Sequence, residues 1–143
     1  MTPQQLAEAC ADAMWAEDRA SRELGMRIAR IAPGEADLTM TVEARMVNGH
    51  GICHGGVIFA LADSAFAFAC NSFNRRAVAQ SNTITYLRPA RLGDTLTARA
   101  VQTAGAGRSG ITDVTVTDAE GRQVAVFRGL SRTIEGHLVE TAP

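Results

Sequence analysis

The chain has 143 residues, of which 46% are hydrophobic and 20% charged, and its net charge at pH 7 is −1. This length and composition predict one globular domain over residues 1–143. The near-neutral charge argues against a nucleic-acid-binding protein, which usually carries a basic excess. Asp63 interrupts the one long apolar run, so we expect no membrane-spanning segment.

The cysteines and the N-terminus indicate a reducing compartment. The chain has three cysteines, Cys10, Cys53 and Cys70, an odd number without C-x-x-C spacing. Its first residues lack the basic flank and apolar stretch of a secretory signal. We therefore expect reduced thiols and a cytoplasmic protein.

Residues 2–24 predict a helix. Thr2 can cap its N-terminus, Pro3 suits the first helical position, and Gln5 completes a capping box. The apolar positions recur at helical spacing and form one stripe: Leu6, Cys10, Met14 and Trp15.

From residue 26 the hydrophobic period changes from that of a helix to that of a strand. Residues 26–47 contain two alternating stretches, and Pro33 and Gly34 between them predict a hairpin. A second helix is expected from about Val57 to Asn71. Because that helix is apolar almost all round, it should be buried on every side.

After residue 76 the chain is strand-like. Four alternating segments are rich in Val, Thr and Ile, and turn residues link them: 77–87, 94–104, 110–119 and 123–134. An apolar helix needs a sheet curled around it to shield it from water. The pattern therefore predicts an α+β protein with a hotdog fold, an antiparallel sheet wrapped around one long central helix, with an N-terminal helix. The element count alone also allows another α+β fold.

Two glycines mark the start of the central helix. A helix N-terminus presents unpaired N–H groups and a partial positive charge, and Gly55 and Gly56 place no side chain in front of them. A ligand oxygen could approach closely, as an oxyanion site requires. The alternative is that these glycines only permit a tight turn into the helix.

Asp63 lies inside the apolar helix. A carboxylate is rarely buried without a partner, and burial would raise the pKa of Asp63 and make it a better base near neutral pH. The alternative is a carboxylate satisfied by a nearby hydroxyl such as that of Ser81.

The spacing between these features constrains the site. Asp63 lies seven or eight residues beyond the two glycines, about 11–12 Å along a helix. Reacting atoms must come within about 3–3.5 Å, so both features cannot serve one centre within one subunit. They can if two central helices pair antiparallel, which predicts an obligate two-fold dimer with two composite sites.

Other candidate sites are weaker. His50, Cys53 and His54 do not complete a usual ligand set, so no metal is expected. A Cys53–His54 nucleophile is disfavoured because sequence neighbours usually point apart. Residues 105–110, GAGRSG, lack the Gly-Lys-Ser/Thr of a phosphate loop and lie between strands, which predicts a turn. Three arginines at turns could contact the phosphates of a large anionic ligand: Arg88, Arg91 and Arg108.

Three stretches resemble a known family. They are NGHGICHGGVIFALADSAFAFACNS at 48–72, YLRPARLGDTLTARA at 86–100, and AVFRGLSRTI at 125–134. They are similar to the hotdog-fold acyl-CoA thioesterases, especially the phenylacetic acid degradation (PaaI-type) group, over nearly the whole chain. The resemblance implies a homodimer, commonly a homotetramer, that hydrolyses an acyl-CoA thioester without a metal or organic cofactor. It slightly favours phenylacetyl or hydroxyphenylacetyl groups as the acyl group, with medium-chain acyl groups as the alternative.

The resemblance also implies roles for individual residues. Asp63 would be the nucleophile or general base, and the N–H of Gly55 or Gly56 would polarise the thioester carbonyl. Asn48 would orient the carbonyl or the water, with His54 in support. Ser81 would lie near Asp63 on the following strand. The residues that would receive the CoA portion are Tyr86, Arg88, Pro89, Arg91, Gly107, Arg108 and Ser109.

Two other functions remain as alternatives. An enoyl-CoA hydratase would need a histidine five residues after Asp63, where this chain has Phe68. A non-catalytic acyl-CoA-binding protein would need an attached DNA-binding segment or a basic face, and the sequence suggests neither. Three aromatic residues could line an aromatic acyl pocket or pack in the core: Phe66, Phe68 and Phe73.

Overall fold

The computed structural model describes residues 1–141; residues 142–143 of the predicted domain lie outside this part. The elements in chain order are α1 (Pro3–Glu17), α2 (Arg19–Glu23), β1 (Arg27–Ala32), β2 (Glu35–Thr41), the short 3₁₀ helix η1 (Ala44–Met46), α3 (Gly55–Cys70), β3 (Ala77–Tyr86), β4 (Thr95–Ala106), β5 (Ser109–Thr117) and β6 (Gln123–Thr133). No helix among them is long and apolar enough to cross a membrane.

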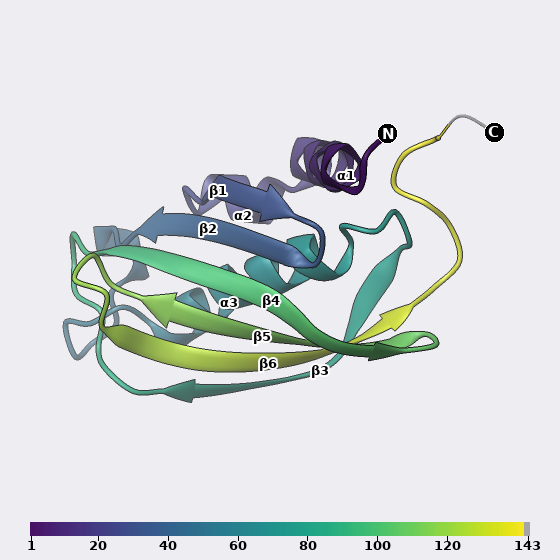
Figure 1. The fold of residues 1–143 in the computed structure, drawn as a ribbon. Helices are drawn as coiled ribbons and strands as arrows, with labels where there is room; N and C mark the ends of the chain where they lie inside the picture. The colour runs from purple at the N-terminus through teal and green to yellow at the C-terminus, as the bar shows by residue number, and fades with distance from the viewer. Residues whose placement is uncertain (142–143) are drawn as a thin grey trace.

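Within the described residues the strands form one antiparallel sheet in the order β1-β2-β4-β5-β6-β3. The sheet curls around α3, which contacts every strand, and α1 packs beside β1 (Figure 1). The predicted hairpin joins β1 to β2. The predicted arrangement of one sheet around one central helix is therefore confirmed.

Two helix boundaries differ from the prediction. The N-terminal helix is two helices, because Asp18 ends α1 and its Oδ1 accepts a hydrogen bond from the Ser21 N–H at 2.9 Å, capping α2. The central helix begins at Gly55 rather than Val57, because His54 serves as its N-cap. The capping box of Thr2 and Gln5 is confirmed.

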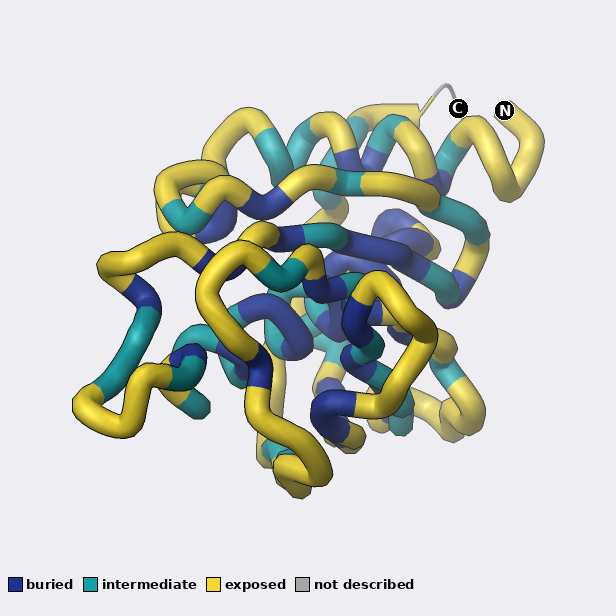
Figure 2. Tube along the Cα trace, turned by 90° about the vertical axis from the view of Figure 1, so that its left-hand side faces the viewer, coloured by how far each residue is buried: buried dark blue, intermediate teal, exposed yellow. Residues whose placement is uncertain are grey.

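Helix α3 is not buried on every side in the single chain. Its apolar side chains fill the core where the sheet and helix meet, while turns and the outer side of α1 are exposed (Figure 2). One strip of the helix stays partly or fully exposed: Gly56, Ala60, Asp63 and Ala67. The sheet covers α3 from one side only, so this strip lacks a covering layer within the chain.

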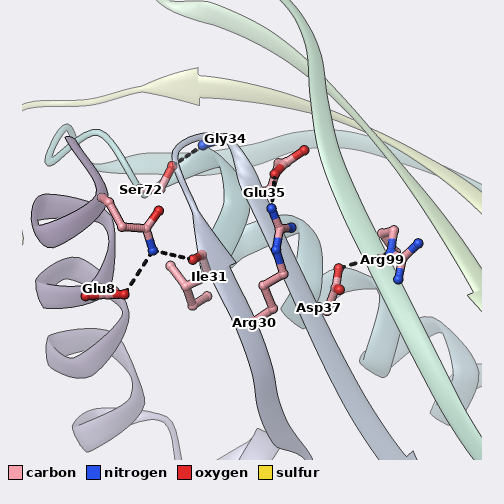
Figure 3. A network of polar contacts seen from close by, with 9 residues as sticks. Glu8, Arg30, Ile31, Gly34, Glu35, Asp37, Ser72 and Arg99 are labelled. Atoms are coloured by element: carbon pink, nitrogen blue, oxygen red, sulfur yellow. Dashed lines mark hydrogen bonds and ion pairs between the residues drawn. The ribbon is translucent and has the colours of Figure 1, made fainter.

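Polar contacts fix the far end of α3 and occupy the outer face of the sheet (Figure 3). Ser72 Oγ accepts a hydrogen bond from the Gly34 N–H at 2.7 Å, which ties the residues after α3 to the β1–β2 turn. Arg99 lies 3.4 Å from Asp37. Because Asp37 alternates with core residues of β2, this pair lies on the face of the sheet away from α3.

Candidate active site

The N-terminus of α3 presents one free amide. His54 Nδ1 accepts a hydrogen bond from the Gly56 N–H at 2.9 Å. The His54 carbonyl accepts another from the Val57 N–H at 2.9 Å. In the described chain no group accepts from the Gly55 N–H. Of the two glycines predicted for the oxyanion site, Gly55 therefore has the available donor, whereas Gly56 uses its own N–H in the cap.

Tyr86 holds the backbone at this position. Its hydroxyl donates a hydrogen bond to the Gly55 carbonyl at 2.7 Å, and its ring lies against the Gly55 Cα. A Cβ at Gly55 would lie 3.1 Å from the Tyr86 Cζ, tighter than ordinary side-chain contacts. Glycine is therefore needed here for the close approach of Tyr86, in addition to any role toward a ligand.

Asn48 closes the loop before α3. Its Oδ1 accepts a hydrogen bond from the His50 N–H at 2.9 Å, and its own N–H donates to the Ile52 carbonyl at 2.8 Å. The Asn48 side-chain oxygen is thus used by the turn. Its NH₂ group meets no acceptor within residues 1–141 and remains available as a donor to a ligand.

A pocket of about 380 Å³ lies at this end of α3. It brings together five predicted site residues: Asn48, Gly55, Tyr86, Arg88 and Pro89. Its apolar lining comes from three residues that the sequence analysis missed: Ile52, Ile58 and Leu87. Cys53 also lines it, but burial raises the pKa of this thiol, which disfavours a thiolate nucleophile.

A second pocket, of about 270 Å³, lies at the opposite end of α3. It contains the predicted residues Gly107 and Ser109, together with Arg75 and Gln102, which the sequence analysis did not assign. Arg91 and Arg108 are exposed and line neither pocket. The predicted CoA-contacting residues therefore form two groups about one helix length apart.

Asp63 lies between the two pockets, on the partly exposed strip of α3. It follows Gly55 by eight residues, about 12 Å along the helix, so one subunit does not bring the two together. Burial raises the pKa of the Asp63 carboxyl, as predicted, and a hydrogen bond from Asn82 opposes this effect. The Asn82 Nδ2 donates to Asp63 Oδ1 at 3.2 Å.

The placement of Ser81 beside Asp63 is wrong. Ser81 is exposed, and the neighbouring Asn82 contacts the carboxylate. Residues 81–86 of β3 pair with β6 without interruption, so their side chains alternate between the two faces of the sheet. Asn82 and the half-buried Ile84 face α3, and Ser81 faces the other way. The apolar Ile84 in this strand was the signal that could have fixed the alternation.

The aromatic residues also divide differently from the prediction. Phe66 and Phe68 are each 1% exposed and pack in the core, against Phe127 and Trp15 respectively. Phe73 is 46% exposed and lines the second pocket. Phe59, which the sequence analysis did not single out, is half-buried and packs edge-on to Phe127.

A metal-ligating cluster or a low-pKa thiol among the described residues would be a further candidate for the chemistry of the site. Residues 1–141 contain no group of three His, Cys, Asp or Glu side chains arranged to hold a metal ion. Burial raises the pKa of Cys70 to about 12, so this thiol stays protonated at neutral pH. Three of the predicted catalytic groups keep an atom available for chemistry: the Gly55 amide, the Asn48 side-chain amide and the Asp63 carboxyl.

Known proteins are similar to this chain in sequence and fold. The thioesterase superfamily model matches residues 50–125. The chain is 45% identical over 132 residues to the acyl-coenzyme A thioesterase PaaI of Escherichia coli strain K12, covering 92% of this chain and 94% of that protein. The structure of the E. coli PaaI protein from the phenylacetic acid degradation operon matches with a TM-score of 0.93 and 43% identity, covering 95% of this chain and 99% of that one.

A Streptococcus mutans UA159 protein solved bound to acetyl CoA matches with a TM-score of 0.76 and 27% identity, covering 78% of this chain and 90% of that one. These similarities confirm the hotdog fold and the family resemblance read from the sequence. The chain belongs to the thioesterase superfamily and is an enzyme of that family.

Proposed function

We propose that this enzyme hydrolyses an acyl-CoA thioester with an aromatic, phenylacetyl-type acyl group to the free acid and CoA. The observation that carries the proposal is that one helix holds two groups suited to thioester hydrolysis. A free Gly55 N–H opens into an apolar pocket, and the half-buried Asp63 carboxyl has a pKa raised by burial. The first group can stabilise an oxyanion and the second can act on water or on the carbonyl.

The chemistry needs no other reactant than water. The Gly55 N–H, with the Asn48 NH₂ group beside it in the pocket, donates hydrogen bonds to the thioester oxygen. As a C–O bond forms at the carbonyl carbon, negative charge develops on this oxygen. The C–S bond then breaks, and CoA leaves as a thiolate that takes up a proton.

Two routes are open to Asp63. As a general base it removes a proton from the attacking water; as a nucleophile it forms an acyl-enzyme anhydride that water then hydrolyses. A single turnover in ¹⁸O water tests the nucleophilic route. Unlabelled acid with the label in Asp63 shows an anhydride that water attacks at the aspartyl carbonyl. Labelled acid fits a general base or attack at the acyl carbonyl, and trapping the acyl-enzyme with hydroxylamine then separates these two.

The site requires two subunits. Because about 12 Å of helix separates Gly55 from Asp63, each Asp63 must face Gly55 of the partner subunit across an antiparallel pair of α3 helices. Two features support this pairing. The strip of α3 that holds Asp63 is uncovered in the single chain, and β3 is an edge strand with Val78 47% exposed.

The same pairing accounts for the two pockets. In an antiparallel pair, the end of α3 near Cys70 lies beside the start of α3 in the partner subunit. The second pocket of one subunit then adjoins the Gly55 pocket of the other, and CoA can contact both groups of residues. Arg88, in the lining of the Gly55 pocket, would meet CoA phosphates, and the acyl group would reach between the helices.

The first experiment measures CoA release from phenylacetyl-, hydroxyphenylacetyl-, benzoyl-, hexanoyl- and crotonyl-CoA by the wild type and by Asp63→Ala. The wild type should favour the phenylacetyl substrates, and the variant should lose at least about 10²-fold in kcat. Tight binding without release by the wild type would indicate an acyl-CoA-binding protein instead. Hydration of crotonyl-CoA would indicate a hydratase.

The second experiment tests the composite site by mixing two inactive variants, Asp63→Ala and Gly55→Pro. In a mixed dimer, one site combines the intact Asp63 of one subunit with the intact Gly55 of the other. Equal mixing with full subunit exchange should restore about a quarter of wild-type activity, because half the dimers are mixed and each has one intact site. No recovery after demonstrated exchange would contradict the shared site.

Assembly and location follow the family resemblance. We propose that two dimers associate into a homotetramer, which sedimentation equilibrium would test; an active monomer would contradict the composite site. The three buried, unpaired cysteines suit a reducing compartment, so we place the enzyme in the cytoplasm.

A further inference from the structure

Asn82 lies where β3 meets the middle of α3. It faces Asp63, and its Nδ2 donates a hydrogen bond to Asp63 Oδ1 at 3.2 Å. Its cross-strand neighbour on β6 is Gly129, where a side chain would collide with Phe66 of α3. The absence of a side chain at Gly129 lets α3 pack close to the sheet, which brings Asp63 within reach of Asn82.

The other half of the Asn82 amide is unsatisfied. Its Oδ1 is buried and has no hydrogen-bond partner among the described residues. A buried acceptor without a partner costs free energy of folding, and an apolar residue of similar size would avoid that cost. Packing therefore does not explain an asparagine here, whereas its contact with the carboxylate does.

Apart from burial and Asn82, few of the described groups affect the ionisation of the Asp63 carboxyl. Cys70 lies seven residues further along the same side of α3, and burial, with a smaller contribution from Asp63, raises the pKa of its thiol to about 12, so this thiol is neutral. The described charged residues at the middle of the sheet pair with one another on the face away from α3: Asp37 with Arg99 and Asp113 with Arg128. From the N-terminal helices, Asp18 accepts a hydrogen bond from Ser21, which contacts Ser64 and not Asp63.

We propose that Asn82 is a positioning residue for hydrolysis: its amide N–H fixes one oxygen of the Asp63 carboxylate and leaves the other free to react. This inference rests on the proposed role of Asp63. Because the hydrogen bond favours the charged form, Asn82 also opposes the rise in pKa that burial imposes on Asp63. Asp63 then stays available as a base at lower pH than burial alone would allow.

The test compares Asn82→Leu with Ser81→Ala, a neighbour on the opposite face of β3. In Asn82→Leu the acid limb of kcat/KM should move to higher pH, so that the ratio of activity at pH 6 to that at pH 9 falls about tenfold. In melts near pH 3, where Asp63 is protonated, thermal stability should be equal or higher because the unsatisfied amide oxygen is gone; at neutral pH the lost hydrogen bond to the Asp63 carboxylate opposes this gain. Ser81→Ala should keep the wild-type profile. If Asn82→Leu does not fold, Asn82→Ala replaces it.

A readout independent of turnover separates this inference from the proposed function. Carbon-13 NMR titration of the Asp63 carboxyl should give a higher pKa in Asn82→Leu than in the wild type, whatever substrate the enzyme takes. An unchanged titration with an unchanged pH profile would overturn the role of Asn82. A shifted titration in a protein that cleaves no acyl-CoA would instead overturn the proposed function and leave the positioning contact standing.

Discussion

The free Gly55 amide can be removed with little change to the backbone. Proline is favoured at the first helical position, where its missing N–H is not needed by the helix. His54 has φ −58° and ψ 131°, an extended conformation that is tolerated before proline. Gly55→Pro should therefore fold and still lose the one N–H assigned to the oxyanion.

The matched control is Gly55→Ala, which adds the same Cβ and keeps the N–H. That Cβ would lie 3.1 Å from the Tyr86 Cζ and hydroxyl, and Tyr86 is 47% exposed, so its side chain can turn away. The cost is then one hydrogen bond, about 0.5–1.5 kcal/mol, or up to roughly tenfold in rate. Removing an oxyanion donor costs about 10²–10³-fold in kcat, so Gly55→Pro should be slower than Gly55→Ala by that factor.

The assay is CoA release at saturating substrate, with circular dichroism and thermal melts to confirm that both variants are folded. A Gly55→Pro enzyme that is folded and as active as Gly55→Ala would refute the assignment of this amide. If both variants lose activity equally, the position of Tyr86 matters and the N–H does not.

Three further predictions test the same structure. Asp63→Asn should lose at least about 10²-fold in kcat yet raise the melting temperature. Burial raises the folded-state pKa of Asp63, so ionising this carboxyl destabilises the folded wild type. This destabilisation is absent below the unfolded-state pKa and grows as the pH rises to the folded-state pKa. The gain should vanish in melts near pH 3, and a gain independent of pH would contradict this cause. Tyr86→Phe should lose about three- to tenfold in kcat, the worth of its 2.7 Å hydrogen bond to Gly55, with KM nearly unchanged; a change in KM alone would assign Tyr86 to substrate binding instead. Gly129→Ala should be destabilised by about 1–3 kcal/mol, lowering the melting temperature by roughly 4–12 °C, because its Cβ would lie 2.5 Å from Phe66 Cδ1 in a closed core. A Phe66→Leu change in the same chain should restore part of the loss, and a wild-type melt for Gly129→Ala alone would show that α3 does not pack this closely.

The sequence predicts the architecture well because its strongest patterns are those that burial enforces. The apolar helix with a single carboxylate, and the six alternating segments around it, follow directly from which side chains must leave water. The hairpin at Pro33 and Gly34 follows from their backbone preferences. Asp63 stands out for the same reason, since an isolated carboxylate in such a helix demands an explanation.

The sequence predicts contacts less well where they depend on exact facing. Nothing in residues 2–24 indicates that the helix ends at Asp18, because the flanking residues all suit a helix. The Asp18 side chain caps α2 only once the chain has turned at this residue. The choice between Gly55 and Gly56 depends on a hydrogen bond to the His54 ring, which sequence spacing does not determine. Asn82 was missed because the family pattern pointed to Ser81, although alternation with Ile84 favours its neighbour.

The assigned oxyanion donor belongs to the main chain, and this separates the chemistry from the choice of substrate. Apart from proline at Gly55 itself, no side-chain substitution that leaves the helix start intact removes the Gly55 amide. Ile52, Ile58 and Leu87, which surround it, can change size without altering that donor. Libraries at these three positions should therefore shift the range of thioesters cleaved while hydrolysis itself persists, which makes the pocket a practical starting point for engineering selectivity.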